Sequence, residues 1–236
     1  WSPQFLDMDP VHGARFALYC EQNQIQFPSL KFILCSYEFV SVVHKKILAR
    51  VFGVPVFNLY GSTETGHLLM ENPHGEMKSS LETAFLEIAD ADESGVGDLV
   101  VTTLTNDFMP LLRYRIGDLA QKIARPYGND FVIHGRARDV LISRAGSRVT
   151  TWQIDQCFVE INGILHYELR QNENGDGVLR FVPETISPTE NEWRDVISKI
   201  ESLLGFKIKM EMMTTLVPAA SGKFRLTHRN LESAGI

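Results

Sequence analysis

Two apolar runs with a helical stretch between them restrict the fold of this chain more than any other feature. The runs at 30–35 and 55–59 have the length of buried strands, and the apolar residues between them recur at helical spacing up to Gly53. Because a strand, a helix and a strand in this order favour parallel pairing, we expect a parallel sheet here. Ligands of such sheets bind beyond the carboxyl ends of the strands. Residues 36–38 and 60–64 are therefore the first candidate sites.

The rest of the chain follows two other patterns. From 81 to 134, short alternating runs are separated by Gly, Asn, Asp and Pro, which is typical of antiparallel sheet. After residue 139 come a strand, a helix near 151–161, two strands around a turn, and a long helix that begins at a Thr189 capping box and ends at Gly205. We therefore predict an α/β plus α+β fold with two domains. The large domain, 1–137, consists of an αβ segment at 1–80 and a β subdomain at 81–137. The second is a small mobile α+β domain at 138–236.

The composition excludes several classes of protein. Hydrophobic residues make up 44% and charged residues 22%, values typical of globular proteins rather than of disordered or collagen-like chains. The net charge of -6 argues against nucleic acid or an anionic membrane surface as the main partner. No apolar run approaches the roughly 20 residues that span a bilayer. Three widely spaced cysteines suggest neither a disulfide framework nor a zinc site, so we expect a cytoplasmic protein.

The loop Tyr60-Gly61-Ser62-Thr63-Glu64 has the composition of a phosphate-binding loop. Its glycine lets backbone N–H groups approach an anion, its hydroxyls donate hydrogen bonds, and Glu64 adds a hard oxygen ligand for Mg²⁺. On its own, a glycine-rich turn with a surface carboxylate explains the loop equally well. Asp118, Arg136 and Lys223 share this ambiguity, because such residues also occur in turns and on surfaces that bind nothing.

Four motifs occur in a fixed order along the chain. They are Tyr60-Gly61-Ser62-Thr63-Glu64, Tyr114-Arg115-Ile116-Gly117-Asp118, Gly135-Arg136-Ala137-Arg138-Asp139 and Ser221-Gly222-Lys223-Phe224-Arg225. Each motif is weak alone, but their order and spacing together are specific. With them the chain resembles the carboxyl-terminal part of an adenylate-forming enzyme of the acyl- and aryl-CoA synthetase superfamily, and it is most similar to the phenylacetate–coenzyme A ligase group.

The resemblance implies a reaction in two steps. A carboxylate attacks the α-phosphate of ATP to give an acyl-adenylate and pyrophosphate, and a thiol, expected to be that of coenzyme A, then displaces AMP. The implied catalytic residues are Thr63, which donates a hydrogen bond to the α-phosphate, and Glu64, which holds Mg²⁺. Lys223 is the implied cation that moves onto the α-phosphate and carboxylate oxygens.

The resemblance also implies a nucleotide site. Its residues are Ser36, Tyr37, Glu38, Tyr60, Gly61, Ser62, Thr63, Asp118 and Arg136. Tyr60 is expected to stack on the adenine, with residues 36–38 as the other wall. Asp118, which we place at the end of a strand, is expected to accept hydrogen bonds from both ribose hydroxyls, and Arg136 to contact ribose and phosphate oxygens.

Similar enzymes rotate the small domain between the two half-reactions. The resemblance places the hinge at Arg138 and Asp139, and the loop that contains Gly146 beside the tunnel for the coenzyme A thiol. Arg138 stands where Asp or Lys is usual, and Tyr37 where most relatives have a small residue. Thr151 replaces a proline before the next helix, and we expect it to cap that helix.

The phosphate loop of the family has no counterpart in these 236 residues. That segment normally lies upstream of the first strand, and the chain begins with Trp1 rather than methionine. We therefore expect a fragment that turns over little or no substrate alone. The expected reactants are an organic, preferably aryl, carboxylic acid, ATP with Mg²⁺, and coenzyme A, and a homodimer is possible. Two alternatives remain: an amine, hydroxyl or carrier-protein acceptor, and a non-catalytic module that binds a nucleotide or a partner.

Overall fold

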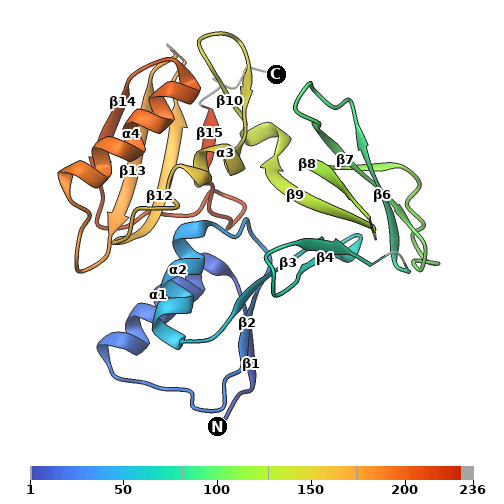
Figure 1. Ribbon diagram of the computed structural model, residues 1–236, viewed down its shortest axis with the longest axis horizontal. Coiled ribbons are helices and arrows are strands. Elements are labelled where there is room, and N and C mark those ends of the chain that lie inside the picture. Colours follow the sequence, from blue (N-terminus) through green and yellow to red (C-terminus); the bar gives the residue numbers. More distant parts are fainter. Residues whose placement is uncertain (1, 81, 127, 174, 230–236) are drawn as a thin grey trace. The chain divides into compact units, whose positions relative to one another are not determined.

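The computed structural model describes residues 2–80, 82–126, 128–173 and 175–229. The chain divides into two compact units, shown in Figure 1. Unit 1 comprises Trp1–Val40 and Leu48–Ala137, and unit 2 comprises Ser41–Ile47 and Arg138–Ile236. The ends of the predicted domain ranges, at Trp1 and 230–236, lie outside the described residues. The assignment of these ranges as folding domains stays a prediction.

Within the described residues, unit 1 is built on one sheet of nine strands. They are β1 (Phe5–Met8), β2 (Phe32–Cys35), β3 (Val56–Ser62), β4 (Gly66–Glu71), β5 (Met77–Ser79), β6 (Ala84–Ala89), β7 (Val96–Thr103), β8 (Tyr114–Arg125) and β9 (Gly128–Arg136). Their order is β1-β2-β3-β4-β5-β9-β8-β7-β6. β1, β2 and β3 pair in parallel, as predicted for the two apolar runs, and β6 to β9 pair antiparallel, as predicted for the second pattern.

Two helices connect the parallel strands: α1 (Pro10–Gln22) and α2 (Val42–Phe52). The Asp9 carboxylate begins α1 by accepting hydrogen bonds from the first backbone N–H groups. Gly13 allows α1 to lie close to the sheet, because a Cβ there would be 2.5 Å from Met8 Sδ. Right-handed crossovers put both connections on the same side of β1 to β3 (Figure 1).

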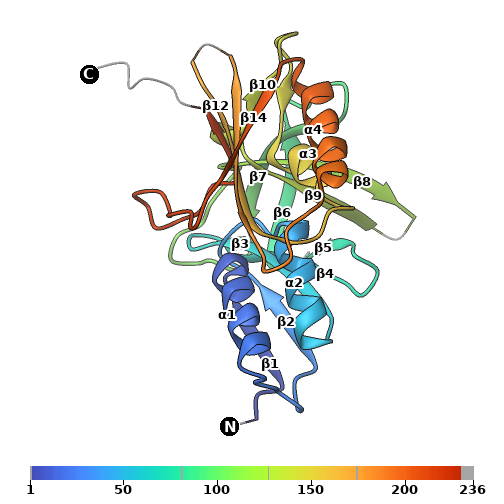
Figure 2. The ribbon, with the colours of Figure 1, turned by 90° about the vertical axis from the view of Figure 1, so that its left-hand side faces the viewer.

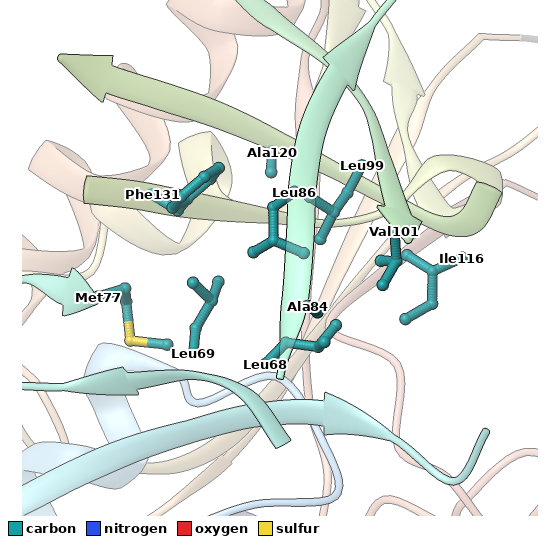
Figure 3. Close-up of a cluster of buried hydrophobic side chains, with 10 residues drawn as sticks. All are labelled: Leu68, Leu69, Met77, Ala84, Leu86, Leu99, Val101, Ile116, Ala120 and Phe131. Atoms are coloured by element: carbon teal, nitrogen blue, oxygen red, sulfur yellow. The ribbon is translucent and has the colours of Figure 1, made fainter. Parts of the chain in front are cut away.

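A cluster of buried hydrophobic side chains in unit 1 joins strands β6 to β9 to strands β4 and β5. Figure 3 shows its ten buried side chains: Leu68, Leu69, Met77, Ala84, Leu86, Leu99, Val101, Ile116, Ala120 and Phe131. Each fully buried Leu or Phe in such a cluster stabilises the fold by about 1.5–3 kcal/mol relative to an exposed one. Because these residues come from β4 to β9, the cluster fixes the strands that carry Asp118 and Arg136, and Tyr60 of β3 packs against it.

Unit 2 contains a four-stranded sheet in the order β14-β13-β12-β15 and a two-stranded sheet of β10 and β11. Its elements are η1 (Ala137–Asp139, of which Ala137 belongs to unit 1), β10 (Leu141–Ile142), β11 (Arg148–Val149), α3 (Thr151–Gln156), β12 (Ile164–Gln171), β13 (Gly177–Pro183), α4 (Glu190–Leu204), β14 (Ile208–Met212) and β15 (Thr227–Arg229). Helix α4 lies along the four-stranded sheet (Figure 2). The predicted capping box of Thr189 and Glu192 and the stop at Gly205 are confirmed.

Residues 41–47 group with unit 2 because a buried polar network holds them there. The Asp155 carboxylate accepts hydrogen bonds from Ser41 Oγ, from Val42 N at 2.9 Å and from the Tyr167 hydroxyl at 2.8 Å. Burial raises the pKa of Asp155 to about 6. Lys46 Nζ donates to the backbone carbonyls that follow α3. Asp155 of α3 therefore caps the first turn of α2, and Lys46 of α2 caps the carbonyl groups that follow α3.

Several local predictions were incomplete or wrong. The short strands β1, β4, β5 and β15 were not predicted, because each has few residues and owes its existence to pairing with a neighbour. Helix α3 ends at Gln156, before the predicted limit. Its N-cap is Thr150 rather than Thr151, and Thr151 is instead buried and bonded to Thr227 Oγ1 at 2.7 Å. No helix in the described ranges is long and apolar enough to cross a membrane.

Candidate functional site

The motif from Tyr60 to Thr65 forms a tight hairpin between β3 and β4. Ser62 pairs with Gly66, and the hydroxyls of Ser62 and Thr65 lie 2.9 Å apart across the turn. Gly61 is required by close approach of the backbones, because a Cβ at this position would lie 2.1 Å from the carbonyl oxygen of Gly66. The predicted loop is thus a rigid turn rather than a free segment. It leaves Thr63 exposed and Glu64 partly buried.

Two residues outside the hairpin hold Glu64. The Tyr114 hydroxyl donates to Glu64 Oε1 at 3.2 Å, and Asn106 Nδ2 donates to the Glu64 carbonyl at 3.4 Å. A hydrogen bond from its own backbone lowers the pKa of Glu64, and bonds from Ser62 and Tyr114 act in the same direction. The carboxylate is therefore ionised at neutral pH.

Asp118 lies inside β8, and its predicted place at a strand end is wrong. Ile116, Gly117 and Asp118 lie opposite the single residue Leu99 of β7, so the strand continues through a bulge. Gly117 makes the bulge possible with its φ of 85°. Such a bulge redirects a side chain without ending the strand, and sequence pattern alone does not distinguish the two.

The Asp118 carboxylate is bound by two side chains, one from β3 and one from the neighbouring strand β9. The Tyr60 hydroxyl donates to Oδ2 at 2.6 Å, and Arg136 Nε lies 3.1 Å from Oδ1. Arg136 is also the β9 residue opposite Asp118 in the sheet register, and its Nη1 donates to the Ile116 carbonyl at 3.1 Å. Asp118 is 6% exposed. A buried carboxylate with two donors is fixed in position and keeps lone pairs for further hydrogen bonds.

Tyr60 links this carboxylate to the core. Its ring is partly buried against the cluster of Figure 3. Burial, with the nearby Asp118 charge as the second cause, raises the pKa of Tyr60 well above its ordinary value. The hydroxyl therefore remains a hydrogen-bond donor at all working pH values. Stacking of Tyr60 on an adenine stays a prediction.

Residues 36–38 form a turn after β2 in the same unit. Ser36 is buried and its Oγ donates to Asp7 Oδ1 at 2.7 Å, while Glu38 N donates to the Ser36 carbonyl at 2.9 Å. Tyr37 has a φ of 72° and is 70% exposed. A two-residue hydrogen bond around a positive φ is a rare and strained turn, and strain of this kind occurs mainly at functional sites.

The remaining predicted residues lie in unit 2. Arg138 is exposed and Asp139 is buried in the turn η1. Gly146, with a φ of 83°, belongs to the turn between β10 and β11, where its N–H donates to the Ser143 carbonyl at 2.9 Å. Lys223 lies exposed in the loop between β14 and β15. The structure thus gathers Tyr60, Glu64, Asp118 and Arg136 in one unit, and Lys223 belongs to the other.

Comparison with known proteins gives two curated relatives. The chain is 25% identical over 248 aligned residues to protein CapK of Staphylococcus aureus, covering 98% of this chain and 54% of that protein. It is 32% identical over 164 residues to a phenylacetate-coenzyme A ligase of Thermus thermophilus, covering 62% of this chain and 37% of that protein. No protein-family model matches the chain.

Solved structures agree in fold. A 2-hydroxyisobutyryl-CoA ligase in its postadenylation state matches with a TM-score of 0.76 and 17% identity, over 97% of this chain and 55% of that chain. The anthranilate CoA ligase AuaEII, in complex with anthranoyl-AMP, matches with a TM-score of 0.71 and 16% identity, over 95% and 48% of the two chains.

The chain is therefore similar in sequence to a phenylacetate-coenzyme A ligase and similar in fold to acyl- and aryl-CoA ligases whose structures hold acyl-adenylates. This confirms the resemblance seen in the four motifs. The chain spans 54% and 37% of the two curated relatives and about half of each of these solved structures. Its mixed α/β fold corresponds to that part of an adenylate-forming ligase.

Sequence reasoning missed three contributors to this candidate site. Tyr114 opens one of the four motifs, but its contact with Glu64 depends on how β8 folds beside the hairpin. Asn106 reaches Glu64 from a long loop, and Asp7, which holds Ser36, lies in an unpredicted strand. No signal in the sequence pairs these residues with their partners.

Proposed function

We propose that this chain is the carboxyl-terminal part of a ligase that activates an organic, preferably aryl, carboxylic acid with ATP. The acyl-adenylate then passes its acyl group to coenzyme A. The observation that carries this proposal is the buried Asp118 carboxylate, held by Tyr60 and Arg136 beside the Glu64 hairpin. The names of the relatives support it, since one is a phenylacetate-coenzyme A ligase and solved neighbours hold acyl-AMP.

The cluster has the chemistry that a ribose needs. Asp118 is acceptor-only when ionised, and its two oxygens together offer more acceptor positions than Tyr60 and Arg136 fill. Ribose hydroxyls are donors that match these positions. Arg136 offsets the carboxylate charge and presents further N–H groups toward phosphate oxygens. In this proposal Ser36, Tyr37, Glu38 and Tyr60 enclose the adenine, and the backbone at Gly61 and Ser62 faces the phosphates.

Glu64 fits the role of a magnesium ligand that acts together with the nucleotide. Its carboxylate is ionised, but the described residues contain no group of three His, Cys, Asp or Glu side chains that could hold a metal alone. Mg²⁺ commonly binds through one or two carboxylates and the oxygens of a substrate phosphate. When bound there, the ion offsets negative charge on the phosphate oxygens. Thr63, exposed next to Glu64, donates its hydroxyl to the α-phosphate.

The two steps need different groups from unit 2. Lys223 stabilises the negative charge of the α-phosphate and the attacking carboxylate during adenylation. Rotation at Arg138 and Asp139 then replaces the lysine by the loop around Gly146, beside which the thiol enters. The carboxylate gains the adenylyl group as pyrophosphate leaves, and the thiol gains the acyl group as AMP leaves.

Binding of AMP to the chain tests the nucleotide site directly. We expect titration calorimetry to detect AMP, and Asp118→Asn to weaken its affinity at least about 10-fold, because a charged acceptor for two hydroxyls is lost. Asp98→Asn is the matched control, since Asp98 lies on the adjacent strand and pairs with Arg115 at the surface. Equal affinities in all three proteins would contradict the proposed site.

The acceptor is tested by product analysis. With an aryl acid, ATP and Mg²⁺, we expect mass spectrometry to find the thioester when coenzyme A is supplied, and neither amide nor ester when an amine or alcohol is supplied. If product forms only when an amine or a carrier protein is supplied, that molecule is the acceptor and coenzyme A is not. The 236 residues alone are expected to release little pyrophosphate, and release at normal enzyme rates would show that they need no further segment.

A further inference from the structure

The loop that carries Lys223 is ordered by its own backbone. We call residues 213–226, between β14 and β15, the lysine loop. Ala219 N donates to the Lys223 carbonyl at 2.8 Å, and Gly222 N donates to the Ala219 carbonyl at 2.8 Å. Gly222 has a φ of 79°, which closes this turn. Lys223 therefore leaves a tight turn rather than a flexible coil.

The residues after Lys223 anchor the loop to the four-stranded sheet. The Phe224 ring packs edge-on against His166 of β12, with ring centroids 5.2 Å apart. Leu226 is buried, and its carbonyl accepts a hydrogen bond from Leu169 N at 2.8 Å. Pairing of β15 with β12 continues from there. The loop is thus fixed on its carboxyl-terminal side, within four residues of the lysine.

Asp139 joins this anchor to the turn η1. Its backbone carbonyl accepts a hydrogen bond from Thr227 Oγ1 at 2.8 Å, and its carboxylate oxygen Oδ1 lies 3.6 Å from Arg225 Nε. Arg138 Nε lies 3.9 Å from the same oxygen, but the Arg138 side chain is 65% exposed, whereas that of Asp139 is 12% exposed. One buried carboxylate therefore faces a cation from the turn and a cation from the lysine loop.

We infer that Asp139 is a positioning residue that ties the lysine loop to the turn carrying Arg138. The inference deepens the proposed function, because it assigns the placement of Lys223 to a contact two residues farther along the chain. A loop released at Arg225 would sample more positions, and a catalytic cation that is held in place less of the time stabilises the reacting oxygens less. Movement at the turn is passed to the lysine through the same contact.

Hydrogen exchange tests the tie without any need for activity. In Asp139→Asn and in Arg225→Gln, we expect the amides of residues 219–227 to exchange at least about 10-fold faster than in the unmodified chain, while the amides of α4 keep their rates. Lys207→Gln is the matched control, because it breaks the ion pair of Lys207 with Glu201 elsewhere in unit 2. Unchanged exchange of residues 219–227 in both variants would overturn the inference.

A double-mutant cycle separates positioning from a general structural role. In the full-length polypeptide, we expect Arg225→Gln, which removes the other end of the contact with Asp139, to lower kcat of adenylation about 10-fold, with KM for ATP and the thioester step from supplied acyl-adenylate unchanged. In a protein that already carries Lys223→Ala, the same substitution is expected to lower kcat of adenylation no further. Losses that add, or that affect both half-reactions, would overturn the inference. If the unmodified protein forms no adenylate, the proposed function fails. The hydrogen-exchange rates then test the contact between Asp139 and Arg225 by themselves.

Discussion

The Asp118 cluster and the lysine loop hold their charged groups in opposite ways. Asp118, Tyr60 and Arg136 project from three strands of one sheet, and the carboxylate is buried with donors on both oxygens. Lys223 is exposed on a loop. The residues that follow it, Phe224 and Arg225, hold this loop in place through their contacts. Under the proposed function the Asp118 cluster keeps a nucleotide through two steps, and a rigid sheet suits that role. A group needed in one step only can lie on a loop that leaves.

The comparison is tested most strongly by Lys223→Ala. We expect kcat of adenylation in the native polypeptide to fall about 100- to 1,000-fold, because removal of one fixed stabilising group costs this much in electrostatic catalysis. AMP affinity is expected to stay the same, since the cluster of unit 1 is intact. Pyrophosphate exchange measures the first effect and calorimetry the second. Weaker AMP binding in this variant, or equal loss of thioester formation, would assign Lys223 to holding the nucleotide.

The sequence predicted the elements that have strong local signals. The apolar runs before Ser36 and Tyr60, the alternating strands β6 to β9 and the capped helix α4 all follow from spacing, caps and turn residues. The four motifs also pointed to the enzymes that the comparisons return, because their order is a property of the sequence itself. In these regions local preference and tertiary structure agree.

The predictions that were wrong or missing concern features that depend on contacts between segments distant in the sequence. The bulge at Gly117 exists because β7 and β9 continue on both sides of β8, so Asp118 lies inside a strand rather than at its end. The contact of Tyr114 with Glu64 and that of Asp139 with Arg225 join residues 50 and 86 positions apart in the sequence. No local pattern encodes such pairs, and the roles of the site residues stay predictions.

The rigidity of unit 1 is tested by Gly61→Ala. The added Cβ meets the Gly66 carbonyl oxygen at 2.1 Å, so the hairpin must open, at a cost of about 3 kcal/mol in the free energy of unfolding. AMP binding is expected to fall with it. Gly75→Ala is the control, because a Cβ there has no atom nearer than 3.7 Å and its φ of 80° costs only about 1 kcal/mol. Urea unfolding measures both, and similar costs would show that the hairpin tolerates the methyl group.

The two regions are expected to share a dependence on pH. Burial lowers the pKa of His134, next to Gly135 in unit 1, to about 4, and burial lowers that of His228, after the lysine loop, to about 4. The unfolded chain binds the proton near pH 6.5, so the stability that each neutral ring contributes is complete above this pH and is lost as the pH falls toward 4. For His134 this amounts to about 2 kcal/mol between pH 7 and pH 5.

Replacement of each histidine separates the two contributions. His134→Gln is expected to flatten the decline of the unfolding free energy between pH 7 and pH 5, whatever its effect at pH 7. His228→Gln is expected to do the same, because Arg225, Arg170 and Arg180 also disfavour a charged ring there. Denaturant unfolding at several pH values measures the slopes. A slope equal to that of the unmodified chain would mean that the ring in question is accessible to protons in the folded state.

The smallest expected effect concerns the hydroxyl of Tyr60. Tyr60→Phe removes the donor to Asp118 Oδ2 but keeps the ring against the core, so we expect AMP affinity to fall about 3- to 10-fold, or about 1 kcal/mol. Tyr114→Phe is the matched control, since its hydroxyl contacts Glu64 and lies at the surface. Calorimetry with AMP, which lacks the outer phosphates, is expected to give unchanged affinity for this control. If Tyr60→Phe left AMP affinity unchanged, the carboxylate would not owe its orientation to Tyr60, and the rigidity assigned to the cluster would rest on Arg136 alone.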